Sequence, residues 1–288
     1  MADKNIKIIY TVKEMQKFSD SVRKEGKTIA LVPTMGYLHE GHLSLVRQAK
    51  KKADVTVVSI FVNPTQFSPE EDLEKYPRDF QLDKQLLSEL KVDVIFSPEV
   101  SEIYSHDFQT YVKVEEMTKS LEGASRPTHF RGVTTIVNLL FNCVKPDLAV
   151  FGQKDAQQAA VIRQMVKDLK LDINLIVAPI VREADGLAMS SRNVYLSPSE
   201  RKEALVLSKA LKKGKEMISR GENRTDEIYS AMKKVIDVAD SSNLDYIKIV
   251  NADNFEEAEI LKSGNAYYVL IACRIGKTRL IDNSLIDY

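Results

Sequence analysis

The stretch Ile29-Ala30-Leu31-Val32-Pro33-Thr34-Met35-Gly36-Tyr37-Leu38-His39-Glu40-Gly41-His42 decides the fold. An apolar run leads into a glycine-containing turn, and the helical pattern Leu43–Ala49 follows. Backbone N–H groups at a helix N-terminus are unpaired and partly positive, so such a turn is suited to phosphate. The His-x-x-His spacing places both imidazoles on one side of the first helical turn as hydrogen-bond donors. A helix that merely begins with exposed histidines is the alternative, but the strand–turn–helix context favours nucleotide binding.

Strand-like and helical runs alternate around this stretch through the first 180 residues. The expected strands are 28–32, 54–62, 92–96, 148–151 and 173–177, and the expected helices are about 42–52, 78–90, 133–144 and 156–169. Repeated β–α units predict a parallel sheet with helices on both faces and right-handed crossovers. Ligands bind such sheets at the carboxyl ends of the strands, where residues 33–42 lie. The expected fold class is therefore α/β, a Rossmann-like doubly wound parallel sheet.

The pattern changes after residue 180. A polar stretch, 182–199, precedes two charged amphipathic helices, about 199–220 and 225–240, and strand-like segments at 246–250, 266–272 and 278–281. This order does not continue the parallel sheet and predicts a smaller C-terminal α+β domain. The expected domains are residues 1–180 and 181–288.

Bulk composition describes an ordinary soluble protein. The 288 residues are 44% hydrophobic and 28% charged, and 41 Lys and Arg balance 41 Asp and Glu. A net charge of zero argues against a nucleic-acid-binding surface. Met1–Lys4 does not begin a signal peptide, and no apolar run is long enough to span a membrane, so a cytoplasmic location is expected.

Cysteine usage supports a reduced environment. Cys143 and Cys273 lie far apart within apolar runs, which favours two buried reduced thiols over a disulfide or a catalytic pair. The sequence has no Cys/His cluster and no His-Glu-x-x-His helix, which argues against a structural zinc site.

A second polar cluster is Ala188-Met189-Ser190-Ser191-Arg192-Asn193. Two hydroxyls beside a guanidinium form a compact set of donors for a polyphosphate. Taken alone, the segment also fits a polar turn between domains. Coupled to the His-x-Gly-His turn, it resembles the second half of a split nucleotide clamp on a segment that closes over the triphosphate.

A third cluster, Phe151–Gln158, runs from a strand end into a helix. Gly152 permits close backbone approach, and Lys154 is a point charge for phosphate. Asp155 either caps the helix or accepts a hydrogen bond from a ribose hydroxyl. Gln158, about one turn into the helix, is expected to face the same crevice.

Two further strand-end segments carry polar side chains, Asn63–Phe67 and Arg126–Gly132. The Gln66 amide both donates and accepts hydrogen bonds, which suits a hydroxy acid or a carboxylate. Such loops also occur for purely structural reasons, but four of them at one sheet edge favour a binding site.

With these segments in this order, the chain resembles the pantothenate synthetase (pantoate–β-alanine ligase) family over essentially its whole length. The matching segments are Pro33–His42, Phe61–Phe67, Arg126–Val133, Gly152–Gln158 and Met189–Asn193.

Part of this resemblance is shared more widely. His39-Glu40-Gly41-His42 is similar to an element of the whole nucleotidyltransferase superfamily, and Gln66, His129 and Gln158 narrow the resemblance to this ligase. Tyr37 and Thr128 depart from the family pattern, where a small residue and a glycine, respectively, are common.

The resemblance implies a two-step reaction. The carboxylate of (R)-pantoate attacks the α-phosphorus of ATP, giving pantoyl adenylate and pyrophosphate. The amine of β-alanine then attacks the mixed anhydride, giving pantothenate and AMP. His39 and His42 are implied to contact the phosphates, with His42 as the proton donor to the leaving pyrophosphate.

The resemblance also implies the remaining site residues. Those with catalytic roles are His42, His39, Lys154 and Arg192. Those that bind ATP are Met35, Gly36, Tyr37, Leu38, His39, Glu40, Gly41, His42, Gly152, Gln153, Lys154, Asp155, Val181, Met189, Ser190, Ser191 and Arg192. Those that bind pantoate and β-alanine are Pro33, Thr34, Met35, Gln66, His129 and Gln158. Tyr76 and Asp83 match family positions near the phosphates, and Asp83 is the candidate near Mg²⁺, the expected counterion of ATP. A homodimer through the N-terminal domain is implied, with the C-terminal domain closing over ATP.

Three other functions compete with this one. Another adenylyl- or cytidylyltransferase would need a cationic pocket for a phosphorylated acceptor, whereas Gln66 and Gln158 offer amides. A truncated class I aminoacyl-tRNA synthetase or other RNA-binding module is disfavoured by the neutral charge. An inactive ATP sensor is disfavoured by the intact His39, His42, Lys154 and Arg192.

Overall fold

The computed structural model describes residues 6–68 and 73–288. Met1–Lys4, whose sequence argues against a signal peptide, lies outside these residues. The chain forms two compact units, Met1–Gly152 with Val161–Ala178, and Gln153–Ala160 with Pro179–Tyr288. The domain boundary expected near residue 180 stays a prediction. Residues 153–160, which carry Lys154, group with the second unit.

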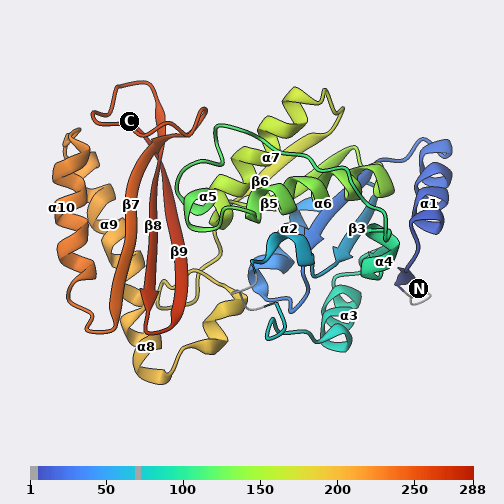
Figure 1. Ribbon diagram of the computed structural model, residues 1–288, viewed down its shortest axis with the longest axis horizontal. Helices are drawn as coiled ribbons and strands as arrows, with labels where there is room; N and C mark the ends of the chain where they lie inside the picture. The colour runs from blue at the N-terminus through green and yellow to red at the C-terminus, as the bar shows by residue number, and fades with distance from the viewer. Residues whose placement is uncertain (1–5, 69–72) are drawn as a thin grey trace. The chain divides into compact units, whose positions relative to one another are not determined.

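A parallel sheet forms the centre of the first unit (Figure 1). Among the described residues its strands are β1 (Lys7–Ile9), β2 (Ile29–Thr34), β3 (Val55–Ile60), β4 (Val94–Phe96), β5 (Leu148–Gly152) and β6 (Asn174–Ala178). They lie in the order β1-β4-β3-β2-β5-β6, with all pairs parallel. The predicted doubly wound sheet is confirmed. Because the strand order reverses between β2 and β5, the ligand crevice is expected at their carboxyl ends.

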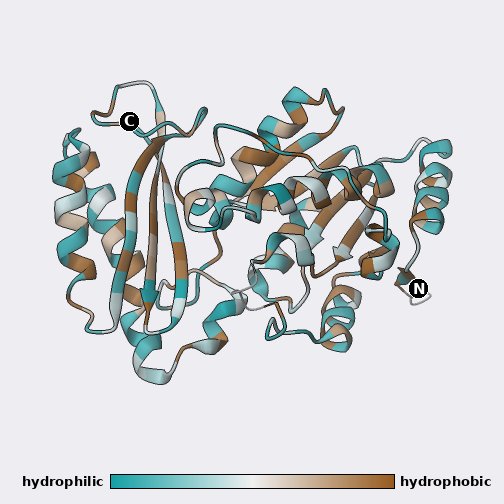
Figure 2. Cartoon of the chain, in the orientation of Figure 1, coloured by the Kyte–Doolittle hydropathy of each residue, from teal (hydrophilic) through white to brown (hydrophobic). Residues whose placement is uncertain are grey.

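Helices cover both faces of this sheet. Their bounds are α1 (Val12–Lys24), α2 (Glu40–Lys50), α3 (Phe80–Glu89), α4 (Val100–Ile103), α5 (Glu122–Ser125), α6 (His129–Val144) and α7 (Ala156–Asp168), with a 3₁₀ turn η1 (Pro64–Gln66). Along β2, Ile29 and Leu31 pack into a core shared with α1 and α6, and Ala30 and Val32 pack into a second core shared with α2 and α3. The strands are therefore hydrophobic on both faces, as buried parallel strands are (Figure 2).

Helix α1 is absent from the elements predicted above, although its sequence carries a signal. The Thr11 hydroxyl accepts a hydrogen bond from the Glu14 N–H at 3.3 Å, which caps the helix. Met15, Ser19 and Val22 follow at helical spacing and are buried. The cap and this periodicity together were enough to predict a helix.

An antiparallel sheet forms the second unit. It consists of β7 (Ser242–Asn251), β8 (Ala266–Ile275) and β9 (Thr278–Asp287), with β8 in the middle and almost continuously apolar (Figure 2). Helices α8 (Pro198–Glu203), α9 (Leu205–Ser219) and α10 (Thr225–Ile236) and the 3₁₀ turns η2 (Gln153–Asp155) and η3 (Ser191–Tyr195) complete it. The predicted α+β composition is confirmed.

The predicted bounds of one helix and three strands in this unit are wrong. The helix expected at 199–220 is divided at Ala204 into α8 and α9. The strands extend beyond their apolar runs because backbone pairing continues through polar residues such as Arg274 and Arg279.

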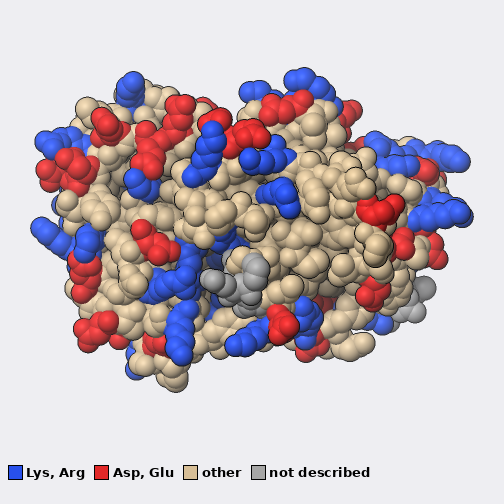
Figure 3. Space-filling view, viewed as in Figure 1, with Lys and Arg blue, Asp and Glu red and all other residues tan. Residues whose placement is uncertain are grey.

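Surface charge and helix length agree with the composition. Basic and acidic side chains are mixed over the face shown in Figure 3. Among the described residues, no helix is both long and apolar enough to cross a lipid bilayer.

Both cysteines are free and buried, as predicted. Burial raises the pKa of each thiol to about 11, because a thiolate loses its hydration there. We therefore expect neither thiol of the folded protein to react with a disulfide reagent at pH 8, and both to react in denaturant. A spectrophotometric thiol titration measures this, and rapid labelling of either cysteine in the native state would contradict it.

Candidate active site

The turn after β2 is closed by a glycine that no other residue can replace without movement. Gly36 has a φ of +82°, and a Cβ there would lie 2.9 Å from the Asp83 Oδ2 and 3.1 Å from the Ile60 Cγ2. The next residue, Tyr37, also has a positive φ, +51°. A left-handed backbone disfavours a residue with a Cβ by roughly 1–2 kcal/mol, so the turn needs support from its surroundings.

Asp83 supplies that support from the first turn of α3. Its Oδ2 accepts the Tyr37 N–H at 2.8 Å, and its Oδ1 accepts the Leu38 N–H at 2.7 Å. The side chain is 1% exposed, and burial raises the pKa of its carboxyl although the two N–H groups act in the opposite direction. Asp83 thus holds the shape of the predicted phosphate turn, a role that the sequence analysis missed. Its predicted place near a metal stays a prediction.

His39 and His42 cap helix α2 reciprocally. The His39 Nδ1 accepts the Gly41 N–H at 3.1 Å, and the His42 Nδ1 accepts the His39 N–H at 3.3 Å. The two ring centroids are 4.1 Å apart. Because each Nδ1 accepts a hydrogen bond, each neutral imidazole carries its proton on Nε2. The turn therefore presents two Nε2–H donors side by side, instead of two fully exposed histidines.

Glu40 lies between the two histidines in sequence but has a different partner. Its carboxylate forms an ion pair with the guanidinium of Arg47, two turns along α2, and both side chains are exposed. This pairing balances a carboxylate that would otherwise repel phosphate.

Gln66 lies in η1, after β3, and is buried. Its Oε1 accepts from the Asn63 Nδ2 at 3.1 Å, and its Nε2 lies 3.0 Å from the Met35 Sδ. The Asn63 Oδ1 accepts in turn from the Tyr104 hydroxyl at 2.8 Å. Two predicted substrate residues, Met35 and Gln66, are therefore in contact, with the amide held by a polar network that the sequence did not reveal.

His129, at the start of α6, contacts the backbone of Gln66. It is 7% exposed, and its Nδ1 lies 3.0 Å from the Gln66 carbonyl oxygen and its Nε2 3.2 Å from the Arg126 Nη1. The helix approaches closely because residue 132 is glycine, where a Cβ would lie 2.4 Å from the Thr65 carbonyl oxygen. Thr128, one of the departures from the family pattern, has an ordinary φ of −95° and needs no glycine.

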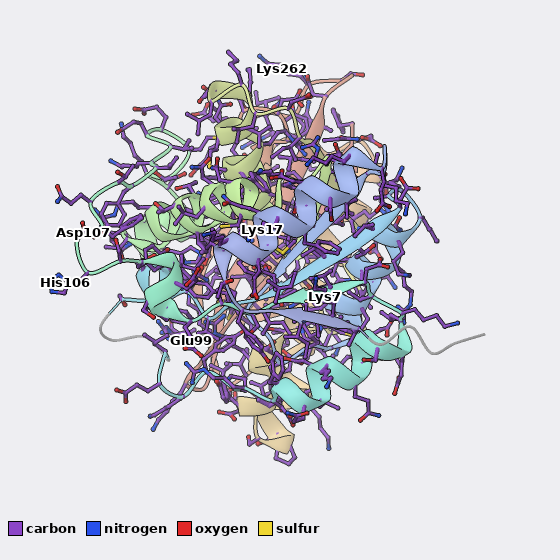
Figure 4. All side chains as sticks on the ribbon, turned by 90° about the vertical axis from the view of Figure 1, so that its right-hand side faces the viewer. Lys7, Lys17, Glu99, His106, Asp107 and Lys262 are labelled. Atoms are coloured by element: carbon purple, nitrogen blue, oxygen red, sulfur yellow. The ribbon has the colours of Figure 1, made fainter. Side chains whose placement is uncertain are left out.

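Two further residues of the first unit, Tyr76 and His106, differ in exposure. Tyr76 is buried, with its ring centroid 5.9 Å from that of Phe67. His106 has no predicted role, and it is exposed on a loop from which it points away from the body of the unit (Figure 4).

The second unit holds the predicted ATP residues that follow residue 152. The Met189 N–H donates to the Val181 carbonyl oxygen at 3.0 Å, so the two predicted adenosine residues lie side by side. In η3 the Ser190 Oγ accepts the Arg192 N–H at 3.3 Å, and Ser191 is buried. The segment 181–192 is thus a folded hairpin and turn.

Lys154 and Asp155 lie in η2 of the same unit, with the Lys154 Nζ 3.7 Å from the Asp155 Oδ1. The Asn283 Nδ2 donates to the carbonyl oxygens of Gln153 and Lys154, each at 2.9 Å. Gln158 is half-buried in the first turn of α7.

The structure thus brings the predicted residues together in two groups. Pro33–His42, Gln66, Asp83 and His129 belong to the first unit, and Gln153–Gln158, Val181 and Met189–Arg192 belong to the second. Their union around a single triphosphate stays a prediction. Within the part of the chain that the structure describes, no group of three or more His, Cys, Asp or Glu side chains is placed to hold a metal ion.

Comparison with known proteins identifies similar sequences and structures. The family model described as pantoate-beta-alanine ligase matches residues 7–285. A pantothenate synthetase of Thermotoga petrophila is 54% identical over 281 residues, 98% of this chain and 100% of that protein. The structure of a pantothenate synthetase from Thermus thermophilus superposes with a TM-score of 0.91 at 42% identity, covering 97% of this chain and 99% of the other. A pantoate-β-alanine ligase from Francisella tularensis, solved in complex with "Beta-gamma ATP and Beta-alanine", superposes with a TM-score of 0.78 at 35% identity, covering 97% of each chain.

Proposed function

This chain belongs to the pantoate–β-alanine ligase family, and from that premise we infer that it is an ATP-dependent ligase that joins pantoate to β-alanine to give pantothenate. The observation in the structure that best supports this activity is the pair of imidazoles of His39 and His42, whose Nδ1 atoms accept backbone N–H groups, together with the Met35–Gln66 contact. The two imidazoles suit phosphate oxygens, and the Gln66 amide suits a small hydroxy acid.

In the first step, a carboxylate oxygen of pantoate forms a bond to the α-phosphorus, and the bond from that phosphorus to the bridging oxygen of pyrophosphate breaks. Negative charge grows on the phosphate oxygens as this happens. The Nε2–H groups of His39 and His42 are proposed to donate to these oxygens, with His42 donating toward the departing pyrophosphate. Donors fixed before the reaction stabilise the developing charge without reorganisation.

In the second step, the uncharged amine of β-alanine forms a bond to the acyl carbon, the bond from that carbon to the AMP oxygen breaks, and the nitrogen releases one proton to solvent. Gln66 is proposed to orient pantoate through its amide, because Asn63 fixes the amide plane. Pro33, Thr34 and Gln158 are proposed to complete the substrate site. His129 is proposed to act through the Gln66 backbone that it contacts.

The remaining ATP contacts are proposed to come mainly from the second unit. Lys154, Ser190, Ser191 and Arg192 would bind the β- and γ-phosphates, and Asp155, Val181 and Met189 would line the adenosine together with Gly152 of the first unit. Mg²⁺ is proposed to arrive with ATP as the counterion of its phosphates. A homodimer and a cytoplasmic location are likewise proposals that follow from family membership.

An adenylyl- or cytidylyltransferase that acts on a phosphorylated acceptor is the competing activity. Such an acceptor requires cationic side chains around its phosphate. The Gln66 side-chain amide instead contacts the neutral side chains of Asn63 and Met35, and the nearby Arg126 guanidinium donates to the Gln66 backbone carbonyl oxygen. An unphosphorylated acceptor is therefore the better match.

The partial reactions test this function. We expect pyrophosphate release to require ATP and (R)-pantoate together, and AMP release to require β-alanine in addition. Coupled assays for each product, with one substrate omitted at a time, measure both dependences. Turnover with a phosphorylated acceptor and none with pantoate would instead establish the competing activity.

A further inference from the structure

Two adjacent polar residues on β9, Asp282 and Asn283, are buried in the second unit at 3% and 2% exposure. Burying a polar side chain costs free energy unless its hydrogen bonds are satisfied. The hydrogen-bond partners of Asp282 and Asn283 therefore indicate the role of these two residues. Neither residue has a role in the reaction described above.

Asn283 binds the turn that carries Lys154. Its Nδ2 donates to the carbonyl oxygens of Gln153 and Lys154, both at 2.9 Å, and its Oδ1 accepts from the Gln153 Nε2 at 3.2 Å. The amide thus satisfies both of its donor hydrogens and its oxygen on two consecutive residues. This is a close match between one side chain and one turn, across 129 residues of sequence.

Asp282 binds the segment that leads to Met189–Arg192. Its Oδ2 and Oδ1 accept from the Arg182 Nη1 at 2.7 Å and Nη2 at 2.9 Å, a bidentate pair. The Arg182 Nη1 also donates to the Gly186 carbonyl oxygen at 3.1 Å, which closes the turn of the 181–189 hairpin. Strand β9 therefore holds both this hairpin and the turn that carries Lys154.

We propose that Asn283 and Asp282 are positioning residues for ATP, which attach the Lys154 turn and the Met189–Arg192 segment to one strand so that both bind the triphosphate as a single half-site. This inference rests on the proposed function, since it assumes that Lys154 contacts the phosphates. It explains why residues 153–160 group with the second unit although β5, directly before them, belongs to the first. It also implies that Lys154 keeps its place relative to Arg192 whenever the second unit moves.

Calorimetric titration of the full-length protein with ATP, in the absence of pantoate, tests the inference. Asn283→Ala should weaken ATP binding roughly tenfold through the loss of its hydrogen bonds to the turn. Asn283→Asp keeps the side-chain volume but sets an oxygen against two carbonyl oxygens, and should weaken ATP binding at least as much. The KM for pantoate should stay within about twofold of the wild-type value in both variants, since residues of the first unit dominate that site.

A double-mutant cycle with Lys154→Ala separates positioning from general loss of structure. In the Lys154→Ala background, Asn283→Ala should weaken ATP binding less than about twofold further, because the lysine that it positions is gone. Leu280→Ala is the matched control, since Leu280 is a buried apolar residue of the same strand. It should lower the melting temperature and leave ATP affinity unchanged.

Additive effects of Asn283→Ala and Lys154→Ala would overturn the inference, and so would equal weakening of ATP binding by Leu280→Ala. Failure of the proposed function gives a different result, in which the wild-type protein releases no pyrophosphate from ATP and pantoate.

Discussion

Replacing His42 with alanine should lower the rate of pyrophosphate release by roughly 10²- to 10³-fold, the usual loss when one preorganised donor to a transition-state oxyanion is removed. ATP affinity should fall much less, because charge on the phosphate oxygens is greatest in the transition state. Rapid-quench measurement of the first step, together with calorimetric ATP binding, gives the two quantities.

Two further substitutions separate the functions of the two ring nitrogens of His42. Asparagine places a polar atom near the Nδ1 position, so His42→Asn should keep the hydrogen bond from the His39 N–H and the thermal stability, yet lose the first step. Glutamine places an amide N–H near the Nε2 position, and His42→Gln should recover part of the rate. If alanine reduced ATP binding and the first step equally, His42 would contribute binding alone.

Replacing Asp83 with alanine should lower the free energy of unfolding by about 3 kcal/mol, because one buried and one partly buried N–H group lose their carboxylate acceptor. Without these bonds the left-handed backbone at Tyr37 is unsupported, so the turn that carries both histidines should shift. We expect kcat to fall at least tenfold. Denaturant titration and steady-state kinetics measure the two effects.

Asp83→Asn and Asp79→Ala provide the controls. The amide of asparagine accepts one of the two N–H groups and turns its own donor toward the other, so Asp83→Asn should give an intermediate loss. Asp79 also accepts a backbone N–H, from Leu82 at 3.0 Å, but this bond caps its own helix α3. Asp79→Ala should therefore cost no more than a typical N-cap, about 1 kcal/mol, and leave kcat unchanged. Full activity in Asp83→Ala would show that the turn holds its shape without the carboxylate.

Much of the fold followed from local sequence patterns. The apolar run in 28–32 and the β-branched run at 54–62 predicted buried parallel strands, and the apolar positions of α3 and α6 predicted their helices within a few residues. The polar ends of strands β7, β8 and β9 were less predictable, because backbone pairing holds them and no apolar pattern marks them. The division at Ala204 was also missed, since the charged periodicity continues across it.

The candidate site was predictable where its chemistry lies within one segment. His39 and His42 are three residues apart, so strand, turn and helix alone predicted two imidazoles at a helix N-terminus. By contrast, the supports of the site come from far along the chain. Asp83 lies 45 residues from Leu38, His129 lies 63 from Gln66, and Asn283 lies 129 from Lys154.

By itself, the sequence determined the alternation of strands and helices after α1, the fold class and the residues proposed to bind phosphate, because these depend on periodicity and on neighbours within one or two turns. Only the tertiary structure decided which carboxylate holds the strained turn and which unit carries Lys154. These features depend on contacts between segments that are far apart in the sequence. Local sequence patterns do not show which of these segments meet in the folded chain.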